Sequence, residues 1–241
     1  MRLDICIPAY NEASIIPDTI RTVLRSVEGL AGVSSRVVVV DNSSTDGTAD
    51  AARSVAHPSV SVLSISLRGK GAAITEAARI STADFFAFID ADLSAHPDDI
   101  ETLLAPIIAS QADIVIGSRL LDQRIVSRNI LRTISSKMFN AVRRAILGIR
   151  VLDSQCGLKI MDEKGRRLLA RCQETGWFFD LEFLARAERA GLSIREVPVR
   201  WEEERYVGRS SKLRPIKDGI LALIAMGRIA LRLRRDAHAT V

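Results

Sequence analysis

Short apolar runs alternate with longer stretches of helical period along the first half of the chain. Each run is rich in β-branched or aromatic residues, and each ends at polar residues or glycine before the next helical stretch begins. Such alternation predicts an α/β fold, in which a mainly parallel sheet is covered by helices and ligand groups lie at the carboxyl ends of the strands. The predicted strands run from Leu3 to Ile7, Arg36 to Val40, Val60 to Ile65, Phe85 to Ile89 and Asp113 to Ile116.

Helices are predicted between these strands, because turn and capping residues precede each helical pattern. The first pattern spans Ser14 to Val27, and the last runs from Pro97-Asp98-Asp99 to Ser110. Two more helices are expected after Thr45-Asp46-Gly47-Thr48 and at Gly69-Lys70-Gly71.

The second half of the chain is more helical and rich in arginine. Pro198 marks the strand from Ile194 to Trp201 as an edge strand or a bent one. The final helix is amphipathic, and its longest apolar run is shorter than the roughly 20 residues that cross a bilayer. The remaining predicted elements are arginine-rich helices from Arg124, a turn from Asp153 that enters a strand near Ile160, helices from Glu163 to Ala170 and Asp180 to Ala190, and the final helix from Ile216 to Arg234.

The composition is typical of one globular domain. The chain has 241 residues, of which 47% are hydrophobic and 26% charged. Its net charge is +5 and arginine is concentrated after Arg119, so we expect a positive surface suited to phosphates or anionic lipid; an ordinary solvated basic face is the alternative. A nucleic-acid partner is disfavoured, because aromatic residues are few and are not interleaved with the basic ones.

Cysteine usage and the amino terminus favour a cytoplasmic location. Cys6, Cys156 and Cys172 are widely spaced and form no Cys-x-x-Cys pair, so we expect reduced packing residues. The three histidines have no spacing that would build a zinc site. The chain opens on an apolar strand without the features of a secretory signal, so export is not expected.

Asp90-Ala91-Asp92 is the strongest chemical signal in the chain. It follows an apolar strand directly, so its first carboxylate should lie at the carboxyl edge of the sheet and its second in the following turn. A divalent cation there could collect both carboxylates and hold the diphosphate of a nucleotide. The alternative is that both aspartates cap the next turn or helix.

A second candidate site is cationic. Arg128, Arg132 and Ser136 recur every four residues and therefore share one face of a helix, and Arg119 follows the fifth predicted strand. Together they could hold an anionic acceptor. From the spacing alone, a solvated basic helix is the favoured interpretation.

Six blocks in order give the chain a resemblance to family 2 glycosyltransferases, above all to the dolichyl-phosphate and polyprenyl-phosphate sugar synthases, both mannosyl and glucosyl. The resemblance covers Leu3 to Lys212, roughly the whole chain, and six ordered blocks are far more specific than one. It implies a GT-A fold of the Rossmann-like type with an Asp-x-Asp site for Mg²⁺ or Mn²⁺. The blocks are Pro8-Ala9-Tyr10-Asn11-Glu12, Val40 to Thr48, Gly69-Lys70-Gly71, Asp90-Ala91-Asp92-Leu93, Gly117-Ser118-Arg119 and Gln155 to Lys159.

The resemblance implies a donor side, where a nucleotide sugar binds. Asp90 and Asp92 are the implied metal ligands, with Asp92 as the catalytic one, and Ser94 stands where the synthases often carry Gln. A wall for the base is expected from Pro8 and Tyr10, polar contacts from Asn11 and Glu12, a base or ribose contact from Asp41, a phosphate contact from Lys70, and donor contacts from Asp90 and Ala91.

It also implies an acceptor side, where an anionic lipid phosphate binds. Arg119, Arg132 and Ser136 match the residues that hold the acceptor phosphate in the synthases, and Arg119 and Arg132 are expected to act in catalysis. Arg205 and Lys212 match a mobile segment that closes over the substrates; the matching serine is either Ser210 or Ser211.

The expected activity is inverting transfer of a hexose from a nucleotide sugar to a polyprenyl or dolichyl phosphate. The residues around Asp153 and the stretch Phe179-Asp180-Leu181-Glu182 are more similar to the glucosyl synthases than to the mannosyl ones. This similarity favours UDP-glucose over GDP-mannose. Asp153, Asp180 and Glu182 could line the sugar pocket, or cap a helix. A hydroxyl acceptor, with Asp153 or Asp180 as base, and a non-catalytic nucleotide-sugar binding protein are the alternatives.

The chain is expected to divide into residues 1–212, which form the catalytic domain, and 213–241, the amphipathic helix and tail. Within the first part, 1–120 should bind the donor and 121–212 the acceptor. Arg228, Arg232 and Arg235 form one stripe of the final helix near Ile220, Leu223 and Ile224, which favours a peripheral position at the cytoplasmic face of a membrane or against a membrane partner. The alternative is a terminal helix that covers the core.

Overall fold

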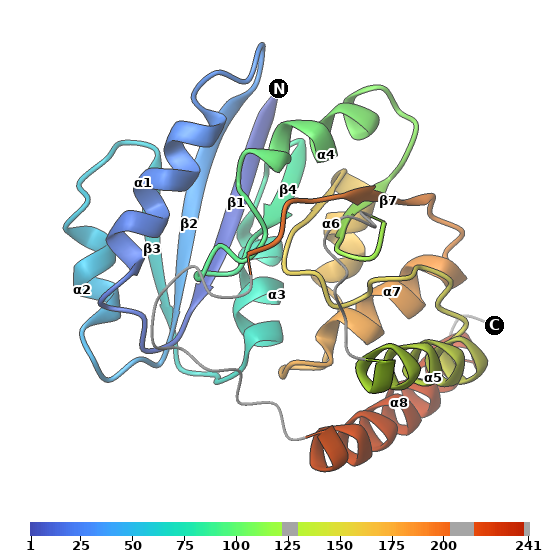
Figure 1. Cartoon of the computed structure of the whole chain (residues 1–241). Helices are drawn as coiled ribbons and strands as arrows, with labels where there is room; N and C mark the ends of the chain where they lie inside the picture. The colour runs from blue at the N-terminus through green and yellow to red at the C-terminus, as the bar shows by residue number, and fades with distance from the viewer. Residues whose placement is uncertain (122–129, 203–214, 239–241) are drawn as a thin grey trace.

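A single sheet of seven strands, in the order β3-β2-β1-β4-β6-β5-β7, organises the protein (Figure 1). The computed structural model describes residues 1–121, 130–202 and 215–238, and their side chains except at 130–138, 215–218 and 237–238. The strands are β1 (Arg2–Ala9), β2 (Ser34–Asn42), β3 (Val60–Ile65), β4 (Phe85–Phe88), β5 (Ile114–Ser118), β6 (Lys159–Met161) and β7 (Ile194–Pro198).

All strands of the sheet are parallel except β6, which runs antiparallel to both β4 and β5. The prediction of a mainly parallel sheet is therefore confirmed. Because β6 is reversed, its amino end lies at the same edge as the carboxyl ends of its neighbours. The prediction that Pro198 lies in an edge strand is also confirmed, since β7 ends the order.

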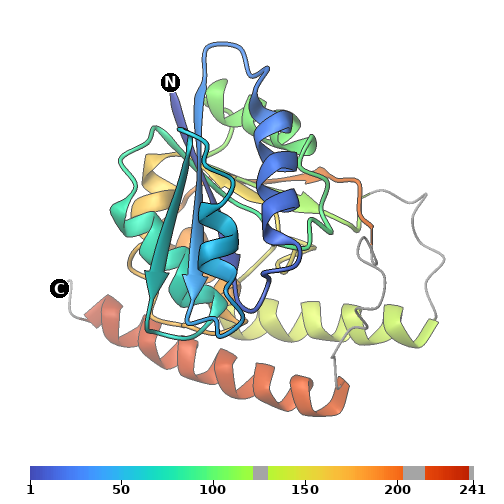
Figure 2. The same cartoon turned by 90° about the vertical axis from the view of Figure 1, so that its left-hand side faces the viewer.

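Helices cover both faces of the sheet (Figures 1 and 2). Strands buried on both faces become almost continuously apolar, and in β4 all of Phe85–Phe88 is buried. On one face lie α1 (Ile16–Val27), α2 (Thr48–Arg53) and α4 (Asp99–Ile108); on the other lie α3 (Lys70–Ile80), α6 (Glu163–Leu169) and α7 (Phe179–Arg189).

Two long helices, α5 (Ile130–Leu147) and α8 (Pro215–His238), lie side by side beyond the sheet (Figure 2). The inner face of α8 buries apolar side chains, among them Met226, Ile229 and Leu233, because the helix packs on α5 and α7. The alternative that α8 covers the core is therefore correct for this face. Among the described residues, no helix has the length and apolarity to span a bilayer.

Two arginines of the α8 stripe are paired with acids of the domain. Arg228 pairs with Glu174 at 2.6 Å and Arg232 with Glu182 at 3.0 Å, so both guanidinium groups are bound to acids of the domain, although the Arg228 side chain is 53% exposed. The sequence did not suggest these partners, because a helical stripe cannot reveal which acids lie opposite. Arg235 is exposed.

The three cysteines are free and buried, as expected of packing residues. Burial raises the pKa of each thiol, for Cys156 to about 11. They therefore remain protonated at neutral pH and poorly nucleophilic.

Candidate active site

The Asp-x-Asp residues lie in the turn after β4, at the carboxyl edge of the sheet. Asp90 Oδ1 is 2.6 Å from Lys70 Nζ, and Asp92 Oδ1 accepts a hydrogen bond from the Ser94 backbone N–H at 3.0 Å. A Cβ atom at Gly157 would lie 2.2 Å from Asp90 Oδ2, so only glycine lets the β6 segment pass this carboxylate. The position of both aspartates is thus set by neighbours on three segments.

Lys70 is a buried cation whose side chain is 11% exposed. Burial alone lowers its pKa, but the carboxylates of Asp90 and Asp180 outweigh burial and raise it, so the ammonium remains charged. Two backbone donors at the start of α3 already have partners within the protein. Gly69 N–H donates to Asn42 Oδ1 at 3.2 Å, and Ala72 N–H donates to the Thr175 carbonyl at 3.1 Å.

The few carboxylates at this edge fit a divalent cation that takes most of its coordinating oxygens from a bound phosphate and from water. Asp92 is half-buried, and its hydrogen bond from Ser94 orients the carboxylate while Oδ2 accepts no hydrogen bond from the described residues. No group of three or more His, Cys, Asp or Glu side chains suited to a metal occurs in the described part of the chain. Mg²⁺ and similar ions commonly use one or two carboxylates plus phosphate and water, so this sparse donor set is suitable.

The expected base wall lies at the ends of β1 and β2. Ala9 is opposite Asp41 in the parallel register, so the loops after both strands leave the sheet together. Tyr10 is 46% exposed, with the Arg68 guanidinium 5.7 Å from its ring centre, and Pro8 is half-buried beside it. Asp41 is buried and accepts the Ser44 N–H at 3.3 Å.

Asn11 and Glu12 join two loops, a role that the sequence did not suggest. Asn11 Oδ1 accepts the Thr45 N–H at 2.9 Å, and the Glu12 N–H donates to Thr48 Oγ1 at 2.8 Å. The Asn11 N–H donates to Ser44 Oγ at 3.0 Å, and Asn11 itself has a positive φ of 55°. The loops after β1 and β2 therefore form one hydrogen-bonded unit.

Arg119 follows β5, as predicted, and is clamped by Asp153. Its Nε and Nη2 donate to the two Asp153 oxygens at 2.7 and 2.6 Å, and its backbone N–H donates to Oδ2 at 2.9 Å. The Trp201 ring lies 4.6 Å from the guanidinium carbon. Burial acts to raise the pKa of Asp153, but the hydrogen bonds and charge of Arg119 outweigh it, so the pKa is lowered. A carboxylate with a lowered pKa is poorly suited to act as a base.

Asp180 and Lys159 form a second buried ion pair, with Nζ and Oδ1 separated by 2.6 Å. Lys159 Nζ also donates to the Cys156 carbonyl at 2.7 Å and lies over the Phe88 ring. Burial raises the pKa of Asp180, although Lys159 and Lys70 act to lower it. Because the Asp180 side chain is 4% exposed, an acceptor hydroxyl cannot reach it in this arrangement.

Several acceptor residues lie outside the described part of the chain. Arg132 and Ser136 belong to the α5 backbone, but their side chains are not described, and Arg205 and Lys212 lie in 203–214. Sequence reasoning missed Lys159, Trp177 and Trp201. A lysine inside an apolar strand was the available signal for Lys159, because such a residue requires a buried partner.

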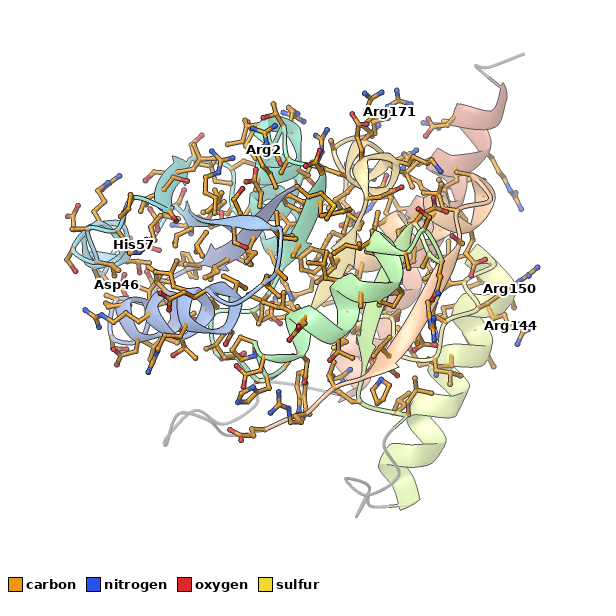
Figure 3. The ribbon with its side chains drawn as sticks, turned by 90° about the horizontal axis from the view of Figure 1, so that it is seen from above. Arg2, Asp46, His57, Arg144, Arg150 and Arg171 are labelled. Carbon is orange, nitrogen blue, oxygen red and sulfur yellow. The ribbon has the colours of Figure 1, made fainter. Side chains whose placement is uncertain are left out.

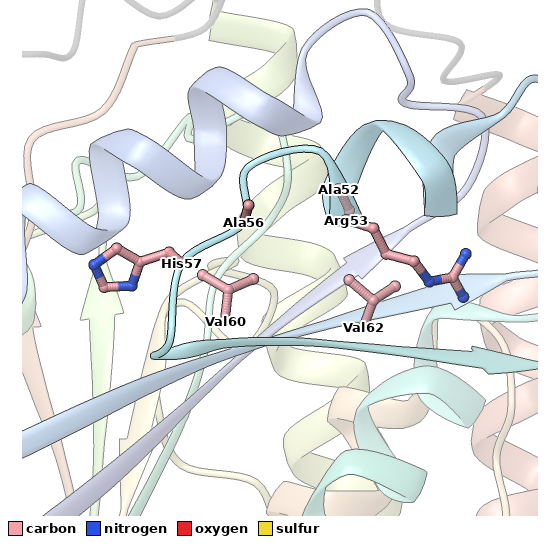
Figure 4. A pocket seen from close by; sticks show the side chains of 6 residues that line it. All are labelled: Ala52, Arg53, Ala56, His57, Val60 and Val62. Carbon is pink, nitrogen blue, oxygen red and sulfur yellow. The ribbon is translucent and has the colours of Figure 1, made fainter.

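Two shallow pockets lie away from this edge. One of about 200 Å³ lies between α2 and the amino-terminal half of β3 (Figure 4). Its polar side chains are those of Arg53 and His57 alone, and none of the predicted site residues lines it. It is lined by Ala52, Arg53, Ala56, His57, Val60 and Val62.

Comparison with known proteins identifies the family. Residues 4–166 match the profile of Glycosyl transferase family 2. The chain belongs to that family. Its enzymes transfer glycosyl groups, and the resemblance seen in the sequence is confirmed.

Curated relatives carry related names. The chain is 29% identical to the Dictyostelium discoideum "Dolichyl-phosphate beta-glucosyltransferase" over 95% of this chain and 74% of the relative. It is 31% identical to the Drosophila melanogaster protein of the same name, over 84% of this chain and 68% of the relative. It is also 29% identical to "Glycosyltransferase AglD" of Haloferax volcanii over 84% of this chain, which spans only 33% of that protein.

Solved structures agree on the fold. Glucosyl-3-phosphoglycerate synthase from Mycobacterium tuberculosis, in a complex with Mn²⁺, UDP-glucose and phosphoglyceric acid, has a TM-score of 0.66 at 23% identity, covering 96% of this chain and 79% of its own. Mannosyl-3-phosphoglycerate synthase from Rubrobacter xylanophilus has a TM-score of 0.71 at 20% identity, covering 99% and 75%. The GT-A type of fold predicted from the sequence is confirmed.

Proposed function

We propose that this protein transfers glucose from UDP-glucose to a polyprenyl or dolichyl phosphate with inversion. An oxygen of the lipid phosphate attacks C1 of the glucose, and the bond from C1 to the β-phosphate oxygen of UDP breaks as the new C–O bond forms. UDP leaves with the bonding electron pair. The names of the Dictyostelium and Drosophila relatives support this acceptor, and the UDP-glucose complex of the mycobacterial synthase supports the donor.

The observation that carries the proposal is the state of the two candidate bases. A hydroxyl acceptor needs a carboxylate that removes its proton, whereas a phosphate is already anionic. Asp153 is bound by Arg119 through both oxygens, and Asp180 is buried against Lys159. Neither of these two described carboxylates is an accessible base, which favours the anionic nucleophile.

On the donor side, Tyr10 and Pro8 would contact the base, Asp41 the base or ribose, and Asp90 and Ala91 the sugar nucleotide. Asp92, with Asp90 beside it, would hold Mg²⁺ or Mn²⁺. When bound, such an ion neutralises the developing charge on the diphosphate. Lys70 adds a fixed positive charge next to Asp90, so it can assist the same leaving group through space.

On the acceptor side, Arg119 would hold the lipid phosphate. Asp153 and Trp201 fix the direction of its guanidinium, which avoids reordering the side chain on binding. Arg132, Ser136, Arg205 and Lys212, outside the described side chains, complete the proposed contacts.

The outer face of α8 supports a position at a membrane surface, proposed at its cytoplasmic face. Ile220 is 56% exposed, Ile224 58% and Leu231 58%, and Arg234 and Arg235 are exposed next to them. Arg144 and Arg150 lie at the outer end of the neighbouring α5 segment, far from Asp46 and His57 (Figure 3). Apolar side chains flanked by arginine are suited to an anionic lipid interface.

A matrix of donors and acceptors tests the proposal. UDP-glucose and GDP-mannose are each incubated with a short polyprenyl phosphate, with 3-phosphoglycerate or with no acceptor, in Mn²⁺ or in EDTA. We expect UDP release and a mild-acid-labile glucolipid only with UDP-glucose, polyprenyl phosphate and metal. Transfer to 3-phosphoglycerate alone would establish the soluble-acceptor alternative, and donor binding without any transfer would establish a binding protein.

A further inference from the structure

Residues 173–177, here named the strap, cross the first turn of α3. The Ala72 N–H donates to the Thr175 carbonyl at 3.1 Å. A Cβ atom at Gly69 would lie 2.0 Å from the Thr175 oxygen, and one at Gly71 would lie 2.4 Å from the Glu174 oxygen. The two glycines that flank Lys70 therefore allow the strap backbone to approach, which gives this block a structural reason unrelated to phosphate.

Two acids anchor the strap to α8. Glu182 Oε2 accepts the N–H groups of Gln173 at 3.0 Å and Glu174 at 2.6 Å, and Arg232 Nη1 lies 3.0 Å from the same oxygen. Arg228 binds both oxygens of Glu174, at 2.6 and 3.1 Å. Glu182 is fully buried, and its charge is compensated by these partners together with Arg186, which binds Oε1 at 2.8 Å.

The strap ends at Trp177, the most exposed of the large hydrophobic side chains that the structure describes, at 72%. Lys70 Nζ lies 5.3 Å from the centre of its ring and bonds Asp90 at the same time. A tryptophan held at this exposure keeps an apolar face in water, which is typical of a surface that meets a ligand. Its cation contact fixes it beside the Asp-x-Asp turn.

The position of Trp177 at the edge of the sheet indicates which part of the donor it can contact. The base wall is at β1 and β2, and Asp90 and Asp92 follow β4. Trp177 lies against Lys70, which pairs with Asp90, so a donor whose diphosphate lies at the turn after β4 has its sugar within reach of the strap. The apolar C–H face of a hexose matches an indole ring.

We propose that the strap is the sugar wall of the donor site, with Trp177 in contact with the hexose and Arg228 and Arg232 as positioning residues that act through Glu174 and Glu182. The C-terminal helix is then part of the donor site, although Arg228 and Arg232 do not themselves touch the donor. The proposal rests on the proposed function for the presence of a nucleotide sugar. It adds a specificity residue and a positioning helix.

Calorimetric titration of UDP and UDP-glucose in Mn²⁺ tests this wall without any acceptor. We expect Trp177→Ala to weaken the affinity for UDP-glucose about tenfold and to change the affinity for UDP by less than about twofold, because only the sugar loses its contact. Trp177→Phe should restore most of the affinity. An equal loss for UDP and UDP-glucose, or no loss for either, would overturn the assignment of Trp177.

Arg228→Ala tests the positioning role, with exposed Arg235→Ala on the same helix as its matched control. We expect Arg228→Ala to weaken the affinity for UDP-glucose about three- to tenfold and Arg235→Ala to leave this affinity unchanged. The double variant with Trp177→Ala should be no weaker than Trp177→Ala alone, since Arg228 acts through the strap. Full additivity, or an equal effect of Arg235→Ala, would overturn this part.

Glu174→Gln, which keeps the shape of the side chain, repeats the Arg228 measurement if Arg228→Ala does not fold. It should give the same selective loss of UDP-glucose affinity, and an unchanged affinity would contradict the role of the ion pair. Failure of the donor assignment looks different. Wild-type protein that bound GDP-mannose instead of UDP-glucose would refute that assignment alone, and the comparison of GDP with GDP-mannose would then test the strap.

Discussion

The two ends of the carboxyl edge are built from different interactions. At the β1 and β2 end, amide and hydroxyl groups such as those of Asn11 and Thr48 hold the loops through backbone hydrogen bonds. At the β5 and β6 end, charges from distant segments meet in ion pairs, Arg119 with Asp153 and Lys159 with Asp180. Loss of half an ion pair leaves a buried charge, so the second end should tolerate single substitutions less well.

The largest effect on stability is expected for Lys159→Met. It leaves Asp180 buried without its cation and should lower the free energy of unfolding by about 3–5 kcal/mol, measured by urea denaturation. Lys164→Met is the matched control; this lysine is 70% exposed, and its loss should leave the free energy of unfolding nearly unchanged. Adding Asp180→Leu to Lys159→Met should recover most of the loss. Similar losses for both lysines would remove the contrast between the two ends.

Asp92→Ala should instead change catalysis and leave folding nearly intact. We expect kcat to fall about 10²–10³-fold and Mn²⁺ to stimulate turnover no longer, because the variant loses the carboxylate that would hold the ion. Exposed Glu101→Ala on α4 is the control. A variant that kept its Mn²⁺ dependence would show that the metal lies elsewhere.

Asp153→Asn should lower the free energy of unfolding by about 2 kcal/mol, the typical value of a hydrogen bond to a charged group. The folded pKa of Asp153 is lowered, so its stabilisation is fully present above the unfolded pKa near 3.9 and is lost as pH falls through the folded value. Denaturation at pH 7 and at pH 3 measures this. The difference between wild type and variant should shrink at pH 3, and a difference that grew would reverse the sign argued here.

The smallest effect is expected at the donor end. Thr48→Val removes the acceptor of the Glu12 N–H and should cost about 1 kcal/mol with a modest rise in the KM for the donor. Thermal unfolding and donor titration check both. A loss as large as that of Lys159→Met would mean that the two ends are equally sensitive.

The sequence predicted the β1, β2 and β4 part of the edge better than the β5 and β6 part, for a physical reason. Asp41 lies at the end of β2, and Asp90 and Asp92 come shortly after β4, so the end of each strand fixes their place at the sheet edge through local chain geometry. The partner of Arg119 depends on the reversed pairing of β6, which no local pattern contains. The same holds for Arg228 and Arg232, whose acids lie on the strap and α7, and for Lys70, whose carboxylate lies in the turn after β4.

The reversal of β6 has an evolutionary consequence. The chain leaves the sheet after β5 and returns at the start of β6 on the same edge, so the segment between these two strands can be lengthened, shortened or exchanged without altering β1 to β4. Under the proposed function, a change of acceptor then requires a new insert between two fixed anchor points. Diversification of what receives the sugar is thereby separated from preservation of what delivers it.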